Sequence, residues 1–324
     1  MTPKRILVTG ASGCVGHYIA DTLIQQTPHE LFLLVRDPQK LRVDCESRPG
    51  VNVLQGNMHD IERFSNLLKT IDVAVLTAAV WGGTAEVFDI NVVKTIRLMN
   101  LLDPEICEQV IYFSTASILD HDLQPLKQAR EIGTDYIRSK YDCHQRLAKL
   151  AIAPQITTVF PTLVFGGDDT KPYSHLSAGL PDLPKWINLA RFFKVEGSFH
   201  FIHGHDIAQV IAYLIEHPPD IDQPRELVLG GRPVTANQAI AAVCAYLGKR
   251  IYLRFPLPKP LIDLFIALFR VQMAAWDRFC LNYRQFTYRD AVSPETYSLP
   301  MRCPTIADLL NERGIIPRRL GKGQ

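Results

Sequence analysis

A stretch near the start of the chain restricts the folds that this sequence can adopt. Residues 6–8 form a short apolar run, glycines follow at positions 10, 13 and 16, and apolar residues then recur at helical spacing from position 15 to 23. The run predicts a buried parallel strand and the periodic segment a helix. A strand that turns through glycines into a helix is typical of a phosphate-binding site, because backbone N–H groups and the positive end of the helix dipole meet there. The alternative is a tight turn that binds no ligand.

The composition indicates an ordinary globular protein. The chain has 324 residues, 47% of them hydrophobic, and a formal net charge of +2, so no global field points to a nucleic-acid partner. The seven cysteines are scattered and include no C-x-x-C pair, which indicates reduced thiols and a cytoplasmic location. The N-terminus leads directly into the first predicted strand, so we expect no signal peptide.

Short apolar runs alternate with helical patterns through the first half of the chain. Strands are predicted at 31–35, 51–54, 72–79, 109–113 and 156–160, with helices at 61–69 and 86–102. This alternation predicts an α/β fold with a doubly wound parallel sheet, which binds ligands at the carboxyl ends of its strands. We expect a dinucleotide-binding domain at 1–165, a substrate-facing insert at 166–200, and a return to the sheet at 201–232 through a helix (206–216) and a strand (226–229). A smaller, mostly helical C-terminal substrate lobe would follow at 233–324.

The end of the second predicted strand bears on the choice of cofactor. Arg36 follows this strand, and a guanidinium there suits the 2′-phosphate of NADP(H), whereas a carboxylate would suit the free ribose hydroxyl of NAD(H). Asp37 would repel that phosphate if it turned inward, and Arg36 could equally be a surface residue at a strand end. NADP(H) is therefore favoured and NAD(H) stays open. After the next strand, Asn57 and Met58 could reach the adenine, or Asn57 could simply be a turn residue.

A second motif carries the expected chemistry. Tyr136 and Lys140 are four residues apart, so they share one face of a helix. A neighbouring ammonium and the positive nicotinamide of an oxidised cofactor both favour the phenolate form of a tyrosine, which would make Tyr136 a general acid or base. Upstream, residues 113–117 (Phe-Ser-Thr-Ala-Ser) end a predicted core strand and offer hydroxyls that could hold a carbonyl oxygen. The alternative is an exposed helix pair without catalytic function.

These motifs together resemble the extended branch of the short-chain dehydrogenase/reductase superfamily, which includes epimerase/dehydratase and dihydroflavonol-reductase-like enzymes. The resemblance runs from residue 6 to about residue 231. It rests on the glycine turn, Val35-Arg36-Asp37, Thr77-Ala78-Ala79, Asn91-Val92, Ser114-Thr115-Ala116-Ser117, Tyr136-x-x-x-Lys140, residues 161–166 and residues 201–208.

The resemblance implies a Rossmann-type domain and assigns roles to individual residues. It makes Tyr136 the acid/base, Lys140 its partner and a ligand of the nicotinamide ribose, and Thr115, with Ser114 second, the catalytic hydroxyl. The full set of expected cofactor-binding residues is Gly10, Ser12, Gly13, Cys14, Val15, Gly16, Arg36, Asn57, Met58, Thr77, Ala78, Ala79, Tyr136, Lys140, Phe160, Pro161 and Leu163. Trp81, Ser117 and Phe160 are expected to contact substrate.

Several positions depart from the family pattern. Phe160 stands where many members have arginine, Asn57 replaces a common aspartate, and Leu119-Asp120 replaces the usual Tyr-Gly. Dehydratases carry an Asp-Glu pair after their threonine, but this chain has Ala116-Ser117, which argues against dehydration. We also find no cluster for a nucleotide-sugar diphosphate in the C-terminal lobe.

Two further features have competing interpretations. His200, His203, His205 and Asp206 lie close in sequence, but we expect His203 to end a strand and Asp206 to cap a helix, and therefore no metal site. The apolar segment 255–276 is interrupted by Asp263 and Arg270 and is too short to span a membrane. We favour an ordinary helix packed on the substrate lobe. The alternative is a pocket wall or a peripheral membrane contact, made by Leu261, Leu264, Phe265, Leu268 and Phe269 beside Lys249, Arg250, Arg254 and Lys259.

The leading hypothesis is an NADP(H)-dependent oxidoreductase that interconverts a carbonyl and a secondary alcohol on an organic substrate, with bulky apolar compounds among the candidates. The second hypothesis is an epimerase that retains NAD and acts on a sugar nucleotide or a related compound. The third is a non-catalytic NADP(H) sensor or scaffold. A homodimer is compatible with the sequence, and the direction of the reaction is left open.

Overall fold

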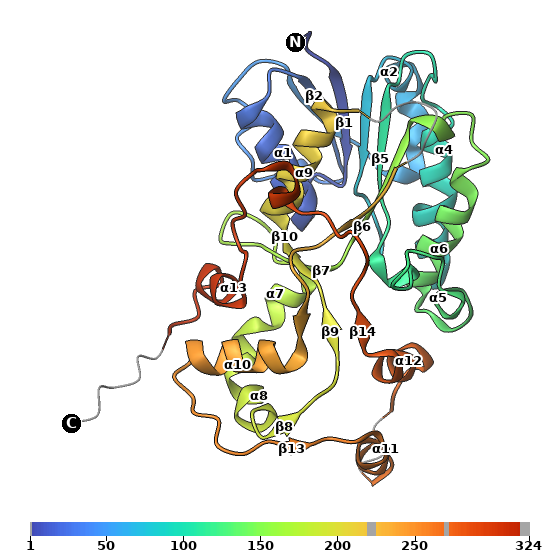
Figure 1. Cartoon of the computed structure of the whole chain (residues 1–324). Coiled ribbons are helices and arrows are strands. Elements are labelled where there is room, and N and C mark those ends of the chain that lie inside the picture. Colours follow the sequence, from blue (N-terminus) through green and yellow to red (C-terminus); the bar gives the residue numbers. More distant parts are fainter. Residues whose placement is uncertain (1, 219–224, 269–271, 318–324) are drawn as a thin grey trace.

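The computed structural model describes residues 2–218, 225–268 and 272–317 (Figure 1). A seven-stranded parallel sheet in the order β11-β6-β5-β4-β1-β2-β3 forms its centre. The strands are β1 (Arg5–Thr9), β2 (Glu30–Val35), β3 (Val51–Gln55), β4 (Val73–Leu76), β5 (Gln109–Phe113), β6 (Ile156–Pro161) and β11 (Arg225–Leu229). The chain returns to the sheet through α9 (Gly204–Glu216) and β11. The predicted doubly wound parallel sheet is confirmed.

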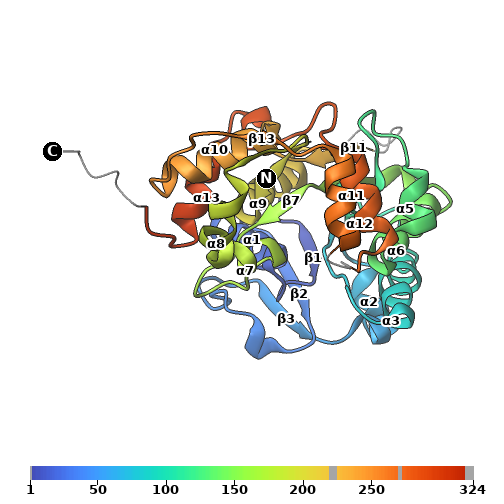
Figure 2. The same ribbon diagram turned by 90° about the horizontal axis from the view of Figure 1, so that it is seen from below.

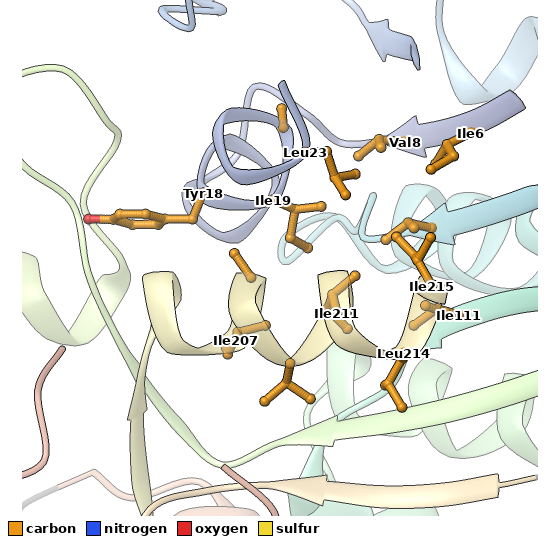
Figure 3. Close-up of a cluster of buried hydrophobic side chains, with 14 of the residues drawn as sticks. Ile6, Val8, Tyr18, Ile19, Leu23, Ile111, Ile207, Ile211, Leu214 and Ile215 are labelled. Carbon is orange, nitrogen blue, oxygen red and sulfur yellow. The ribbon is translucent and has the colours of Figure 1, made fainter. Parts of the chain in front are cut away.

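Alternate residues of the strands feed two separate cores. On one face, Ile6 and Val8 of β1 pack with α1 (Cys14–Gln26) and α9, as Figure 3 shows. Leu7, between them, joins the core on the opposite face. Because both faces are covered, each central strand is apolar at nearly every position, which is the pattern that the sequence shows.

Helices on the opposite face depart from the predicted ranges. The expected helix at 86–102 is α3 (Thr84–Phe88), a π-helical segment η3 (Asp89–Lys94) and α4 (Thr95–Met99) in succession. The π segment contains Asn91, whose amide exchanges two 2.9 Å hydrogen bonds with the backbone of Val80. The expected helix at 61–69 is a 3₁₀ helix η2 (Met58–Phe64) followed by α2 (Ser65–Leu68). Its earlier start follows from Asn57, whose side chain accepts a hydrogen bond from the His59 N–H.

Two further predicted boundaries are wrong. The strand predicted at 72–79 ends at Leu76, because the next residue, Thr77, donates its hydroxyl to the Thr9 carbonyl at 2.6 Å. Asp206 is not a helix cap, since α9 begins at Gly204 and His203 caps it. Asp206 instead accepts hydrogen bonds from the backbone N–H groups of Arg302 and Cys303 and so holds the C-terminal segment.

The insert and the C-terminal segment form one lobe below the sheet in Figure 1. The insert is more regular than its sequence suggests, with α7 (His175–Gly179), η6 (Leu180–Asp182), α8 (Leu183–Ala190), β8 (Phe193–Lys194) and β9 (Ser198–Phe199). After it, β10 (Phe201–His203) pairs with β7 (Leu163–Phe165). The C-terminal segment adds β12 (Val234–Thr235), α10 (Ala236–Tyr246), β13 (Phe255–Pro256), α11 (Lys259–Leu268), α12 (Ala275–Tyr283), β14 (Gln285–Phe286), η7 (Pro294–Tyr297) and α13 (Ile306–Glu312). Pairing of β9 with β12 and β14, and of β8 with β13, joins the two segments.

The smaller elements lie around the sheet. They are η1 (Pro38–Lys40), η4 (Ala116–Ile118), α5 (Lys127–Ile132), α6 (Asp135–Leu147) and η5 (Ala153–Gln155). Within the described ranges no helix is both long and apolar enough to cross a bilayer. The side chains of Leu261, Leu264 and Phe265, and all of Phe269, lie outside the described part of the chain.

The glycine at position 16 allows a direct test of how closely α1 packs on the turn that precedes it. A Cβ atom at Gly16 would lie 2.1 Å from the carbonyl oxygen of Gly10, so Gly16→Ala cannot be accommodated without moving α1. We expect it to lower the free energy of unfolding by about 2 kcal/mol or more in urea denaturation. Gly179→Ala is the control, because a Cβ there meets nothing within 4 Å. Equal stability of the two variants would contradict this packing.

Candidate active site

The glycine turn brings β1, β4 and α1 into contact. Gly10 has a φ of +70°, and a Cβ there would lie 2.8 Å from the backbone of Ala78 and from Thr77 Oγ1. Gly13 is exposed and begins α1 with no side chain capping the helix. The first N–H groups of α1 therefore remain available at a surface that side chains would otherwise fill. This arrangement fits the pyrophosphate of a dinucleotide.

The segment after β7 lies across the N-terminal half of α1. The Gly167 N–H donates to the hydroxyl of Tyr18 at 3.0 Å, and a Cβ at Gly166 would lie 3.4 Å from Cys14 Sγ. Burial raises the pKa of the Cys14 thiol to about 12. Cys14 is consequently a poor nucleophile, and its role in binding a cofactor would be limited to its backbone.

In the loop after β2, the carboxylate of Asp37 and the guanidinium of Arg36, which bear on the choice of cofactor, have different surroundings. Asp37 Oδ1 accepts a hydrogen bond from the Gln39 N–H at 3.1 Å and caps η1. Arg36 is exposed at the carboxyl end of β2. The carboxylate is thus engaged within its own loop while the guanidinium is accessible to a ligand.

His17 fixes this loop against α1, a contact that the sequence analysis missed. Its Nε2 accepts the Arg42 N–H at 3.1 Å, and its Nδ1 lies 3.1 Å from the Gly13 carbonyl oxygen. These partners require the neutral ring with the proton on Nδ1, and burial lowers the pKa of His17 accordingly. The backbone of Arg42 is thereby held against α1, and its guanidinium donates to the Asp169 carbonyl at 3.2 Å. The only sequence signal was the placement of His17 four residues after Gly13.

The helix that carries the predicted acid/base pair starts at a defined cap. Thr134 Oγ1 accepts the Ile137 N–H, which sets the first turn of α6. Lys140 is 2% exposed, and its Nζ donates to the Phe113 carbonyl oxygen at 2.7 Å, at the carboxyl end of β5. The same Nζ lies 5.0 Å from the ring centroid of Tyr112 and 5.8 Å from that of Tyr136. Burial lowers the pKa of Lys140 to about 8.

The surroundings of Tyr136 oppose the ionisation expected for it. Burial raises the pKa of Tyr136 well above its ordinary value, and the Lys140 ammonium donates to the Phe113 carbonyl. Desolvation thus favours the neutral phenol, the form that donates a proton. The expected phenolate, which depended on Lys140 and on an oxidised nicotinamide together, stays a prediction.

Hydroxyl groups of the predicted catalytic strand end lie beside α6. Thr115 caps η4, and its Oγ1 accepts the Ser117 N–H at 3.4 Å, which leaves the hydroxyl hydrogen for another acceptor. Ser114 is buried, and its Oγ has no hydrogen-bond partner within the described residues. Tyr136 borders an apolar cluster built from η4, α5, α6 and α12. The hydroxyl-bearing strand end leads into η4, which contributes to the same cluster as Tyr136.

Trp81 covers the phenol ring. Its indole stacks on Tyr136 with the ring centroids 3.7 Å apart and an interplanar angle of 12°, and it is 59% exposed. The ring of His175 meets Trp81 edge-on at 5.1 Å, so α7 of the insert reaches the same place. Asn91 holds this loop, since it binds Val80 and also donates to Ser139 Oγ on α6 at 3.0 Å. The sequence predicts Trp81 near substrate, but it does not reveal that Asn91 holds the loop that carries Trp81.

Other predicted residues are placed differently. Phe160 is entirely buried, with its ring edge-on to His144 at 5.3 Å, so it presents no surface to a ligand. Thr77 donates its hydroxyl hydrogen to the Thr9 carbonyl and so joins β4 to β1. Leu163 is 39% exposed, and Asn57 caps η2.

The histidine cluster is engaged in structural contacts. His200 binds the Gly231 carbonyl and the Tyr288 N–H with its two ring nitrogens, while His203 caps α9. No group of three or more potential metal ligands lies together in the described part of the chain.

Lys140 should destabilise the fold that buries it. Between pH 8 and 10.5 the folded state has lost this proton while the unfolded state still binds it, so stability rises with pH; below pH 8 the full cost of burial remains. We expect Lys140→Met to raise the free energy of unfolding at pH 7 by about 1–3 kcal/mol. The variant should also lose most of the increase in stability that the wild type shows above pH 8. Urea denaturation at several pH values measures both. Lys149→Met, at an exposed position, should change neither, and a full rise in Lys140→Met would contradict the buried ammonium.

Among known protein families, the model of the NAD dependent epimerase/dehydratase family matches residues 6–230 of the chain. A search of the curated proteins found no match.

Solved structures match over almost the whole chain. The protein gox2253 is 20% identical, with a TM-score of 0.70 over 97% of this chain and 99% of that one. UDP-glucose-4-epimerase from Stenotrophomonas maltophila, with bound NAD and formylated UDP-arabinopyranose, is 17% identical, with a TM-score of 0.66 and 96% of both chains covered. The Bordetella bronchiseptica enzyme WbmG, in complex with NAD and UDP, is 16% identical, with a TM-score of 0.64 and 97% of both chains covered. At these identities the likeness shows the fold.

The family match covers more than half of the chain, and the glycine turn and the Tyr136–Lys140 helix lie within it. The resemblance found in the sequence is confirmed. The chain is an NAD(P)-dependent enzyme that belongs to the NAD dependent epimerase/dehydratase family.

Proposed function

We propose that this enzyme interconverts a carbonyl and a secondary alcohol on a small organic substrate, with NADP(H) as the redox partner. A bound nicotinamide would supply the hydride. Tyr136 gives its proton to the oxygen of the carbonyl, and Thr115 donates its free hydroxyl hydrogen to the same oxygen. Lys140 holds α6 against β5 through its hydrogen bond to the Phe113 carbonyl.

The surroundings of Tyr136 carry the proposal. Its ring stacks on Trp81 and is half-buried beside an apolar cluster, and desolvation favours the phenol that keeps its proton until an acceptor oxygen arrives. This environment suits the protonation of an oxygen that gains negative charge during reduction. The aromatic and apolar surroundings favour a substrate with a flat or bulky apolar part.

The preference for NADP(H) rests on Arg36. This guanidinium is exposed at the end of β2, and the neighbouring carboxylate of Asp37 is occupied by Gln39. The guanidinium of Arg42, in the same loop, donates to the Asp169 carbonyl, so the proposal does not depend on it.

Arg36→Gln tests this choice of cofactor. We expect it to weaken NADPH binding about tenfold or more, because a charge-assisted hydrogen bond to phosphate is lost, and to leave NADH binding nearly unchanged. Isothermal titration with both nucleotides makes the comparison. Arg130→Gln removes an exposed arginine elsewhere and is the control. Equal losses for NADPH and NADH would reject NADP(H) as the preferred cofactor.

The second candidate is an epimerase that keeps NAD bound. The comparisons favour it over a net oxidoreductase, since the matching family is one of epimerases and dehydratases, and two of the similar structures contain NAD with UDP or a UDP-sugar. In such a reaction Tyr136 would take a proton from the substrate hydroxyl and return it after the hydride has been restored to the opposite face. Its raised pKa makes the first of these steps harder.

Tyr136→Phe, together with an assay of bound nucleotide, separates the candidates. The variant should lose most turnover while binding NADPH with nearly unchanged affinity, since the phenol acts only on the reacting oxygen. Denatured wild-type protein should release little nucleotide if the enzyme is a reductase, whereas stoichiometric NAD and turnover of a UDP-sugar would favour the epimerase. Full biological activity of Tyr136→Phe would instead indicate a sensor or scaffold.

A further inference from the structure

An apolar and basic surface lies on the C-terminal lobe, away from the phenol and the glycine turn. It is formed by residues 183–194 of the insert and 249–259 of the C-terminal segment. Both segments lie at the lower end of the molecule in Figure 1, around α8, β8 and β13, and Figure 2 views this end directly. We call it the lobe surface.

The two segments form one continuous surface. Phe193 and Lys194 of β8 pair with Phe255 and Pro256 of β13, and the Phe255 N–H donates to the Phe192 carbonyl at 2.8 Å. Closer to α8, Lys249 Nζ donates to Asn188 Oδ1, and Arg191 donates to the Arg250 carbonyl at 3.1 Å. The surface is therefore ordered by backbone and side-chain contacts between the segments.

Helix α8 is apolar on two sides, but only one of them is covered. Leu183, Ile187 and Ala190 pack into a core with α10. Trp186 and Leu189 face the other way and are 69% and 61% exposed. The neighbouring segment adds Tyr252, Leu253 and Phe255, each between 58% and 73% exposed. This contiguous exposure of large apolar side chains is unusual for a surface that meets only water.

The two segments themselves carry positive charge only. They contain seven cationic residues, Lys185, Arg191, Lys194, Lys249, Arg250, Arg254 and Lys259, and no aspartate or glutamate. The Arg254 guanidinium is largely buried, whereas Lys185, Lys194, Arg250 and Lys259 are exposed. Asp182, just outside, pairs with Lys185 at 2.7 Å. The chain as a whole has a net charge of only +2, so this is a local concentration of positive charge.

We propose that the lobe surface binds peripherally to an anionic lipid membrane. Tryptophan and tyrosine side chains favour the boundary between headgroups and acyl chains, and leucine and phenylalanine would enter the apolar layer beneath. Lysine and arginine around them attract anionic headgroups. The charge complementarity selects a lipid surface over a second copy of this chain, because two copies would bring like charges together.

The surface is connected to the site through one short stretch of chain. His175 of α7 contacts Trp81, and α8 with Trp186 follows α7 after a single 3₁₀ turn. The lobe surface and the residue that contacts Trp81 therefore belong to consecutive elements of the insert.

Vesicle co-sedimentation of the full-length protein tests the proposal. We expect binding to phosphatidylcholine vesicles that contain phosphatidylserine, little binding to pure phosphatidylcholine, and loss of binding as salt rises beyond about 0.1 M. Lys194→Gln, Lys249→Gln and Arg250→Gln combined should weaken binding about tenfold or more. Trp186→Ser with Leu253→Ser should weaken it as well, because the apolar anchors are removed.

The control variants remove charged and apolar side chains of the same kinds from the opposite end of the molecule. Arg63→Gln, Lys69→Gln and Lys149→Gln combined remove three exposed charges, and Ile106→Ser removes an exposed apolar residue. These variants should bind vesicles like the wild type, and all variants should keep the wild-type melting temperature. No binding to anionic vesicles at low salt, or equal losses in lobe and control variants, would overturn the proposal. Dimerisation in sedimentation velocity that Trp186→Ser with Leu253→Ser abolishes, without vesicle binding, would assign the surface to a second copy instead.

Discussion

The fold depends on the close approach of three backbone segments at the start of α1. Gly10 lies against the backbone of Ala78, and α1 packs so closely on this turn that no side-chain atom fits at position 16. Thr77 and Thr9 join the ends of β4 and β1 with a hydrogen bond at the same place. Because these contacts fix where the helix starts, they also fix the direction of its first N–H groups and the edge of the sheet at which a nucleotide can bind.

The catalytic edge follows from the same parallel order of strands. Since β5 lies next to β4, the carboxyl end that carries Ser114 and Thr115 stands beside the loop that carries Trp81. Helix α6 packs over that end, and burial of Lys140 and Tyr136 there sets their ionisation. The predicted acid/base pair is therefore held at some cost to stability, in an environment that raises the pKa of the phenol and lowers the pKa of the amine.

Local patterns in the sequence were enough to predict the sheet and the family. Apolar runs located the central strands, and the glycine turn and the Tyr136–Lys140 spacing contributed to the resemblance. The roles of these residues stay predictions. What could not be predicted depends on contacts between distant segments. Asn91, within the π-helical segment, binds the backbone of Val80. Asp206 binds the backbone of the C-terminal segment and does not cap its own helix. The ionisation of Tyr136 depends on burial, which spacing along one helix does not reveal.

The stacking of Trp81 on Tyr136 has a consequence for observing this enzyme. Of its three tryptophans, Trp186 lies at the lobe surface and Trp276 is buried against α5, whereas Trp81 stacks on Tyr136, the predicted acid/base residue. A ligand bound beside this phenol would change the surroundings of the exposed indole. Trp81 is thus a natural fluorescent reporter at the entrance, through which occupancy can be followed without a label and before any substrate has been identified.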